Sequence, residues 1–136
     1  MPGIQDVPGD QFKDIAIPGQ ATAGTDDEWP VFIAPGKIVV TAVKWTPKSN
    51  VTADDTNNYA LQVLNRGAAG AGSGAVTTVR TMNTGTGNEV KNTPEAFTIG
   101  AAATAVAGDV LALVRTHNGT GLAMPQGTLQ VTFRYR

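Results

Sequence analysis

The sequence predicts an all-β protein, an antiparallel β-sandwich or barrel of about eight strands. Short stretches of alternating apolar and polar residues recur along the chain, separated by turn clusters rich in Gly, Pro and Asn. Long segments with helical periodicity are absent from the pattern. This combination is typical of antiparallel sandwiches and barrels. A length of 136 residues fits one domain, so residues 12–136 are expected to form the sandwich and residues 1–11 an extended N-terminal arm.

The N-terminal arm is punctuated by Pro and Gly and has few apolar residues. Ile4 and Val7 stand alone in it, and Phe12 begins the first expected strand, residues 12–17. A segment too polar to fold by itself orders when it binds a partner, and loses conformational entropy at that step. We therefore expect the arm to be a binding segment, with a frayed terminus as the alternative.

The next two expected strands cover residues 29–34 and 37–45. In the second, Val43 and Trp45 fall on one face by strict alternation, and Ile38 and Val40 on the other. Apolar residues on both faces predict a central strand that is covered on each side.

Later strands are expected at residues 59–66, 75–82, 109–116 and 127–136. The last alternates most regularly, with Leu129, Val131, Phe133 and Tyr135 on one face and Gln130, Thr132, Arg134 and Arg136 on the other. Trp45 and Tyr59 are expected in the core. The Ala-rich residues 100–107 are expected to be strand or irregular, because eight residues bounded by glycines make a marginal helix.

Composition narrows the possible partners. The formal net charge is −1, which gives no electrostatic reason to bind nucleic acid or an anionic membrane. Only 15% of residues are charged, and this leaves a neutral surface suited to burial against other proteins. No stretch has the roughly 18 apolar residues of a membrane span, and the N-terminus does not resemble a signal peptide. We expect the chain to fold in a cytoplasm.

No motif for catalysis or cofactor binding stands out. The chain has no cysteine, and its one histidine, His117, precedes an Asn-Gly turn and is expected in solvent. The loop acids Asp26, Asp27 and Glu28, and the pair Asp54 and Asp55, lack the spacing of a calcium loop, so solvated loop charge or turn capping is favoured over Ca²⁺ binding. Residues 67–74 are glycine-rich but match no phosphate-binding motif and are expected to be a loop. We predict no enzymatic activity, no metal and no cofactor.

Four segments carry a family resemblance. They are residues 38–47 (IVVTAVKWTP), 58–67 (NYALQVLNRG), 107–115 (AGDVLALVR) and 119–135 (GTGLAMPQGTLQVTFRY). In these segments the chain resembles the capsid decoration, or cementing, proteins of tailed bacteriophages. The resemblance covers roughly residues 30–136 and consists of a pattern of strands and turns.

The resemblance implies a jelly-roll-like β-sandwich, usually a homotrimer, on the outer surface of the phage head. The implied partners are the major capsid protein and further copies of the chain, and the implied location is the exterior of the virion after assembly in the host cytoplasm. A protein that binds only the mature shell stabilises it by mass action.

Several residues are candidates for contact in that role. We expect Ile4, Val7, Phe12 and an exposed Trp29 to contact the capsid, and Arg134 and Arg136 to lie near a subunit boundary. The alternative function is a receptor-binding or carbohydrate-binding module of a phage tail or fibre, which would present exposed aromatic side chains. Aromatic residues make up only 6% of the chain, which counts against this alternative.

Overall fold

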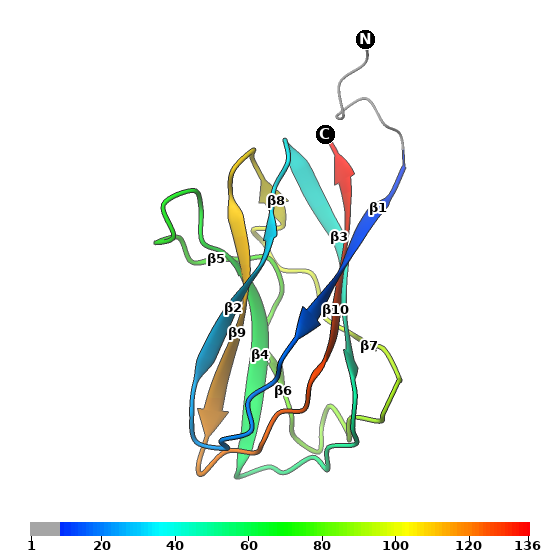
Figure 1. Cartoon of the computed structure of the whole chain (residues 1–136), viewed down its shortest axis with the longest axis vertical. Helices are drawn as coiled ribbons and strands as arrows, with labels where there is room; N and C mark the ends of the chain where they lie inside the picture. Colours follow the sequence, from blue (N-terminus) through cyan, green and yellow to red (C-terminus); the bar gives the residue numbers. More distant parts are fainter. Residues whose placement is uncertain (1–8) are drawn as a thin grey trace.

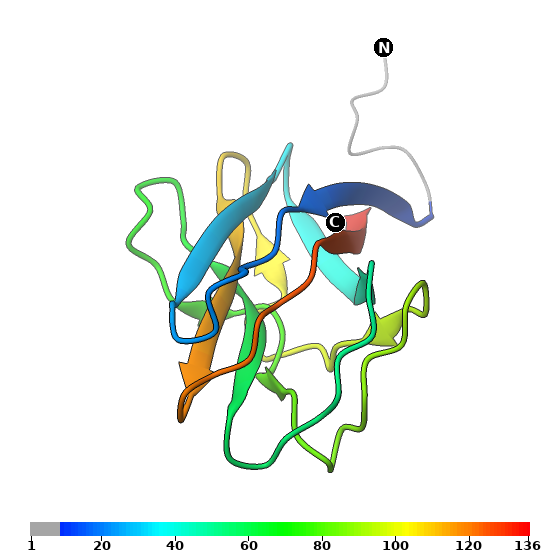
Figure 2. The same cartoon turned by 60° about the horizontal axis from the view of Figure 1, so that its bottom comes forward.

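The structure, a computed structural model, describes residues 9–136 and is a sandwich of two antiparallel sheets (Figure 1). Sheet A contains β1 (Gln11–Ile17), β10 (Gly127–Tyr135), β3 (Ile38–Pro47), β7 (Glu95–Ala96) and β8 (Thr104–Ala105). Sheet C contains β2 (Asp27–Ile33), β9 (Val110–Asn118), β4 (Asn58–Asn65), β5 (Gly74–Ala75) and β6 (Arg80–Thr81). Figure 2 shows the two sheets as separate layers.

The strand order identifies the sandwich as a jelly roll. Sheet A runs β1-β10-β3-β7, with β8 also on β3, and sheet C runs β2-β9-β4-β5, with β6 also on β4. Two short strands that share one neighbour act as one interrupted strand, so the ten segments amount to eight strands. Successive strands then alternate between sheets, except that β4 and the following β5–β6 pair share sheet C, as in the two wound Greek keys of a jelly roll. The predicted fold class is confirmed.

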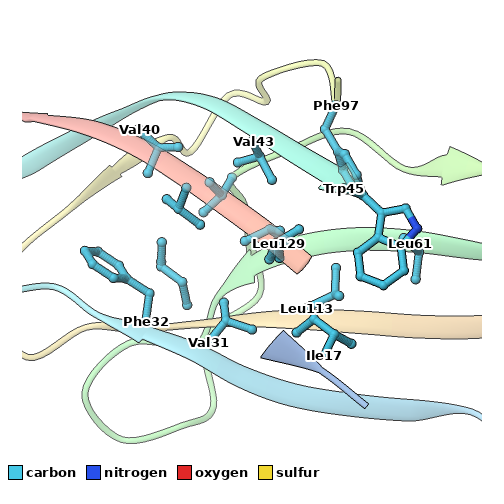
Figure 3. Packing of buried hydrophobic residues seen from close by; sticks show 14 of the residues in the cluster. Ile17, Val31, Phe32, Val40, Val43, Trp45, Leu61, Phe97, Leu113 and Leu129 are labelled. Atoms are coloured by element: carbon cyan, nitrogen blue, oxygen red, sulfur yellow. The ribbon is translucent and has the colours of Figure 1, made fainter. Parts of the chain in front are cut away.

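The core lies between the two sheets and is built from the inward side chains of both (Figure 3). Its largest members include Trp45, Tyr59, Leu61, Leu113 and Leu129, all at most 1% exposed. Trp45 and Tyr59 are therefore core residues, as expected. Each fully buried side chain of this size contributes roughly 1.5–3 kcal/mol by leaving water.

A β-bulge corrects the prediction for β3. Val40 pairs with Phe133 and Ala42 with Thr132, so Thr41 is an extra residue opposite that step. The extra residue shifts the alternation by one position, and Ile38, Val40, Val43 and Trp45 are consequently all buried on the core side. The prediction that both faces of β3 are covered is wrong, because simple alternation cannot register a bulge. Lys44 is exposed on the outer face.

The expected strand over residues 75–82 is wrong as one element, because only β5 and β6, of two residues each, pair with β4 there. The expectations for several other elements hold in outline. The closing strand forms as β10, and the expected glycine-rich loop occupies residues 67–73. The Ala-rich residues 100–107 contain turns and β8 and no helix. Residues 1–8 of the predicted arm lie outside the described part of the chain, and β1 begins at Gln11.

An ion pair joins the two sheets at the edge formed by the short strands. Arg80 of β6 bonds Glu95 of β7, with 3.0 Å between Nη2 and Oε2, and both side chains are less than one quarter exposed. At the opposite edge, β1 and β2 are the outermost strands of their sheets. Lys13 of β1 and Pro30 of β2 line one shallow hollow there, so these two strands lie side by side.

Candidate functional site

A carboxylate is buried inside the sandwich. Glu89 is 1% exposed, and its Oε2 accepts hydrogen bonds from Trp45 Nε1 at 3.3 Å and Tyr59 OH at 3.0 Å. Burial raises the pKa of Glu89, and the two donors offset part of that effect. Burial, together with the Glu89 charge, also raises the pKa of Tyr59. The hydrogen bonds from Trp45 and Tyr59 to Glu89 hold the 82–94 loop against the core.

Arg115 is also buried and organises one end of the sandwich. Its guanidinium donates to the carbonyl oxygens of Thr25, Ala23 and Leu122, and its Cζ lies 5.3 Å from the centre of the Tyr59 ring. The side chain is 0% exposed, and burial lowers its pKa from the usual value. One arginine therefore ties the 18–26 loop and the 119–126 loop to β9.

The acidic loops are engaged in local hydrogen bonds. Asp54 accepts from the backbone N–H groups of Thr56 and Asn57, and these bonds lower its pKa. This confirms the turn-capping interpretation of Asp54. Asp55 accepts from Thr84, which also lowers its pKa. Within residues 9–136, no group of three His, Cys, Asp or Glu side chains is arranged to hold a metal ion.

His117 is paired with an acidic residue. Its ring Nδ1 lies 2.7 Å from Asp26 Oδ1, and its backbone N–H donates to the same oxygen. Both interactions lower the pKa of Asp26. The histidine side chain is about one third exposed, so it is neither buried nor free in solvent.

The outer face of sheet A is polar, apart from Phe12 near one corner. Phe12, Asp14 and Ala16 alternate with residues that face the core, and Asp14 accepts a hydrogen bond from Gln130 on the neighbouring strand. Phe12 is 67% exposed, the highest value among the large hydrophobic residues described. The face thus carries one aromatic side chain on its edge strand.

The outer face of sheet C is less polar and contains a hollow. The hollow has a volume of about 460 Å³ and is lined by Glu28, Pro30, Arg66, Ala68, Ala69, Gly70, Val110 and Ala112. Its floor is the cross-strand pair Pro30–Ala112, and residues 68–70 of the glycine-rich loop form one wall. Most of the residues that line the hollow are apolar.

A fixed arginine stands at the rim of this hollow. Arg66 Nη2 and Nε bond Glu28 at 2.5 and 3.0 Å, and Nη1 donates to the carbonyl oxygen of Gly72 at 3.1 Å. Every nitrogen of the guanidinium has a hydrogen-bond acceptor within the chain, so these bonds hold the side chain in place.

The predicted capsid-contact residues have different outcomes. Ile4 and Val7 lie outside the described residues. Phe12 is an exposed aromatic on an edge strand. Trp29 is partly buried and packs against the hydrophobic core, so the expectation that it is exposed is wrong. It is paired with Leu113, a core residue on β9, and therefore lies on the inner side of β2.

The two arginines of β10 are both tied to their own chain. Arg134 forms an ion pair with Asp10, which precedes β1, and this pair raises the pKa of Arg134. Arg136 donates from Nε to the carbonyl oxygen of Ile38 at 3.0 Å. Both remain exposed. Their role at a subunit boundary stays a prediction.

Sequence reasoning missed Glu89 and Arg115. Arg115 follows Leu111 and Leu113 at a spacing of two, and this parity alone would have placed it on the core face. Glu89 lies between Asn88 and Val90 in an irregular loop, where no periodicity reports burial. The hollow on sheet C was also missed, because it depends on how the 67–73 loop folds over the sheet.

No protein-family model matches the chain, and no curated protein is similar to it at a significant level. Within the described residues, no helix is long and apolar enough to cross a membrane. The inference of function therefore depends on the fold, the surfaces and the resemblance noted in the sequence.

Proposed function

We propose that the chain is a structural protein of a tailed-bacteriophage virion that binds the outer surface of the capsid and stabilises the mature shell. The observation that carries the proposal is the jelly-roll strand order, β1-β10-β3-β7 against β2-β9-β4-β5. The resemblance noted in the sequence implies this fold. The partners in this proposal are the major capsid protein and two further copies of the chain, which form a homotrimer.

The placement of chemically distinctive groups agrees with a role in protein contact. The charged groups inside the sandwich, Glu89 and Arg115, bond neighbouring protein groups that fix loops. The apolar groups outside it, Phe12 and the lining of the sheet C hollow, lie on the surface where partners can bury them. A protein that binds the mature lattice stabilises it through the free energy of binding alone and needs no catalytic step.

Binding to shells tests the proposal. Capsids of the parent phage, stripped of this protein, are mixed with the purified chain, pelleted, and heated to measure the temperature at which they release DNA. We expect saturable binding and a higher release temperature. A chain that stays in the supernatant, or that binds without changing the release temperature, would contradict the proposal.

A truncated variant tests the predicted arm in the same assay. Removal of residues 1–8 leaves β1 and the Asp10–Arg134 ion pair in place. We expect the variant to fold with unchanged thermal stability and to lose most of its shell binding. Undiminished binding would show that residues 1–8 are not needed to bind the shell.

A further inference from the structure

The turn after β9 contains the pair Asn118–Gly119, and Asn118 is the one asparagine of the sequence that is followed by glycine. Both residues are exposed to solvent. The backbone N–H of Gly121 donates to the carbonyl oxygen of Asn118 at 3.0 Å, so the chain reverses direction here. Asn-Gly is the asparagine pair most prone to deamidation, because glycine has no Cβ to hinder attack by its backbone nitrogen.

We propose that Asn118 is a site of spontaneous deamidation and that its hydrogen bond to Asn58 controls the rate of this modification in the folded chain. In the reaction, the backbone nitrogen of Gly119 loses its proton and bonds to Cγ of Asn118. The bond from Cγ to Nδ2 breaks, and Nδ2 takes up a proton and leaves as ammonia. Water then opens the cyclic imide to aspartate or isoaspartate. The only co-reactant is water, so this inference does not rest on the proposed function.

The fold requires glycine at position 119, so the reactive pair is a fixed part of the turn. Gly119 has a φ of +60°, and a Cβ there would lie 2.4 Å from Asn57 Oδ1 and 2.6 Å from the carbonyl oxygen of Thr56. Any other residue would be strained at this φ and would collide with the loop that precedes β4. A substitution that removed the glycine would therefore disturb the turn.

Asn58 holds the side chain of Asn118 in place. Asn118 Nδ2 donates to Asn58 Oδ1 at 2.7 Å, and Asn58 is only 3% exposed. Because Nδ2 is the leaving group, the reaction cannot be completed without breaking this hydrogen bond. The bond therefore slows deamidation in the folded chain.

The product does not fit the contact with Asn58. Asn58 Nδ2 donates to the carbonyl oxygen of Asp54 at 2.8 Å, so Asn58 cannot reverse its amide without losing that bond. Aspartate at position 118 places a carboxylate against the Asn58 oxygen, and isoaspartate also lengthens the backbone by a methylene group. Thr120 N–H donates to Asn57 in the loop before β4, so a displaced turn loosens the contact between these two loops.

Peptide mapping by mass spectrometry tests the site. The full chain is kept in a mildly alkaline buffer, with and without urea, and sampled over weeks. We expect the mass increase of an amide converted to an acid first in the peptide that contains Asn118, with both aspartate and isoaspartate present and with a faster reaction in urea. Earlier modification of another asparagine, or none at Asn118 in urea, would overturn the proposal.

Asn58→Ala tests the control by the hydrogen bond. We expect it to accelerate deamidation of Asn118 in the folded chain about tenfold, the factor that corresponds to a hydrogen bond of ordinary strength. Val131→Ala is the matched control, because it removes packing at a fully buried position of β10 and leaves the bond between Asn58 and Asn118 in place. In urea the wild type and both variants should react at the same rate. Equal rates for the two folded variants would overturn the proposal, because global stability would then control the reaction.

Asn118→Asp reproduces one product directly and tests its effect on the fold. We expect this variant to unfold at a lower temperature than Asn92→Asp, which adds the same charge at an exposed position in the 82–94 loop. Equal unfolding temperatures would show that the contact between Asn118 and Asn58 does not stabilise the fold, and would overturn the proposal.

Discussion

At the scale of single residues, Glu89 makes one pH-dependent contribution to stability. Its pKa is raised from an ordinary 4.5, so the folded state favours the protonated form. The stabilisation linked to that proton is fully present below pH 4.5 and is lost as the pH rises through the pKa of the folded state. Above that range, folding must bury a charged carboxylate.

Glu89→Gln tests this linkage. The amide keeps an oxygen that accepts from Trp45 and Tyr59 but carries no charge, so we expect a free energy of unfolding at pH 7 that exceeds that of the wild type. The difference between variant and wild type should shrink as the pH is lowered towards 4.5. Urea denaturation at several pH values measures it, and a difference that stays constant with pH would contradict the assignment.

Glu89→Ala provides the contrasting variant. It leaves the Trp45 and Tyr59 donors without an acceptor in the core, and each buried unsatisfied group costs about 1–3 kcal/mol. We expect a loss of stability at every pH. If the alanine and glutamine variants had equal free energies of unfolding, the two hydrogen bonds would not contribute to stability.

Gly127 leaves no room for a side chain beside the core tryptophan. A Cβ at this position would lie 2.5 Å from Trp45 Cη2 and 2.4 Å from the carbonyl oxygen of Thr46. Gly127→Ala should therefore lower the free energy of unfolding by about 1–3 kcal/mol through overpacking. Gly24→Ala is the matched control, since its Cβ would meet only one atom, at 3.7 Å. Equal stability of the two variants would show that the Trp45 ring shifts freely.

At the scale of elements, Arg115 couples loops that are far apart in the sequence. Its bonds to Ala23, Thr25 and Leu122 join two loops at one end of the sandwich. Arg115→Met removes these bonds but keeps an apolar side chain of similar length. We expect a loss of about 2 kcal/mol or more, because hydrogen bonds to charged groups contribute about 1.5–3 kcal/mol each.

The location of the change distinguishes this account from general destabilisation. Amide hydrogen exchange should accelerate most at residues 20–26 and 119–124, while the exchange of β3 and β10 should follow the global change only. Uniform acceleration across both sheets would contradict a local role for Arg115.

The elements also show which features of the fold can be predicted from the sequence. Alternation located β10, and turn residues separated most of the strands, because both signals are local. The sequence does not predict which residues of β3 face the core. This depends on the bulge at Thr41, which forms by pairing with β10, more than ninety positions later in the chain. Trp29 was misjudged for a related reason. Its acidic and proline neighbours indicate exposure, but pairing with Leu113 turns its side chain inward.

The short strands were difficult to predict for another reason. The four segments β5, β6, β7 and β8 have two residues each, too few to show alternation. They form where a loop follows an existing strand, so tertiary contact, and not local preference, sets their positions. For the same reason the sheet C hollow could not be expected from the sequence, whereas the exposure of Phe12 follows from its place at the start of an edge strand.

At the scale of the whole molecule, the two edges of the sandwich differ. The far edge is joined by the Arg80–Glu95 ion pair, while the β1–β2 edge carries the exposed Phe12 and adjoins the hollow. The far edge therefore holds the two sheets together, whereas the β1–β2 edge leaves a large aromatic side chain exposed.

The most direct test of the central claim is cryo-electron microscopy of the parent virion. We predict density on the outer surface of the head that fits the two-sheet jelly roll, in groups of three copies. Density for this fold on the tail or its fibres, or none on the head surface, would contradict the account.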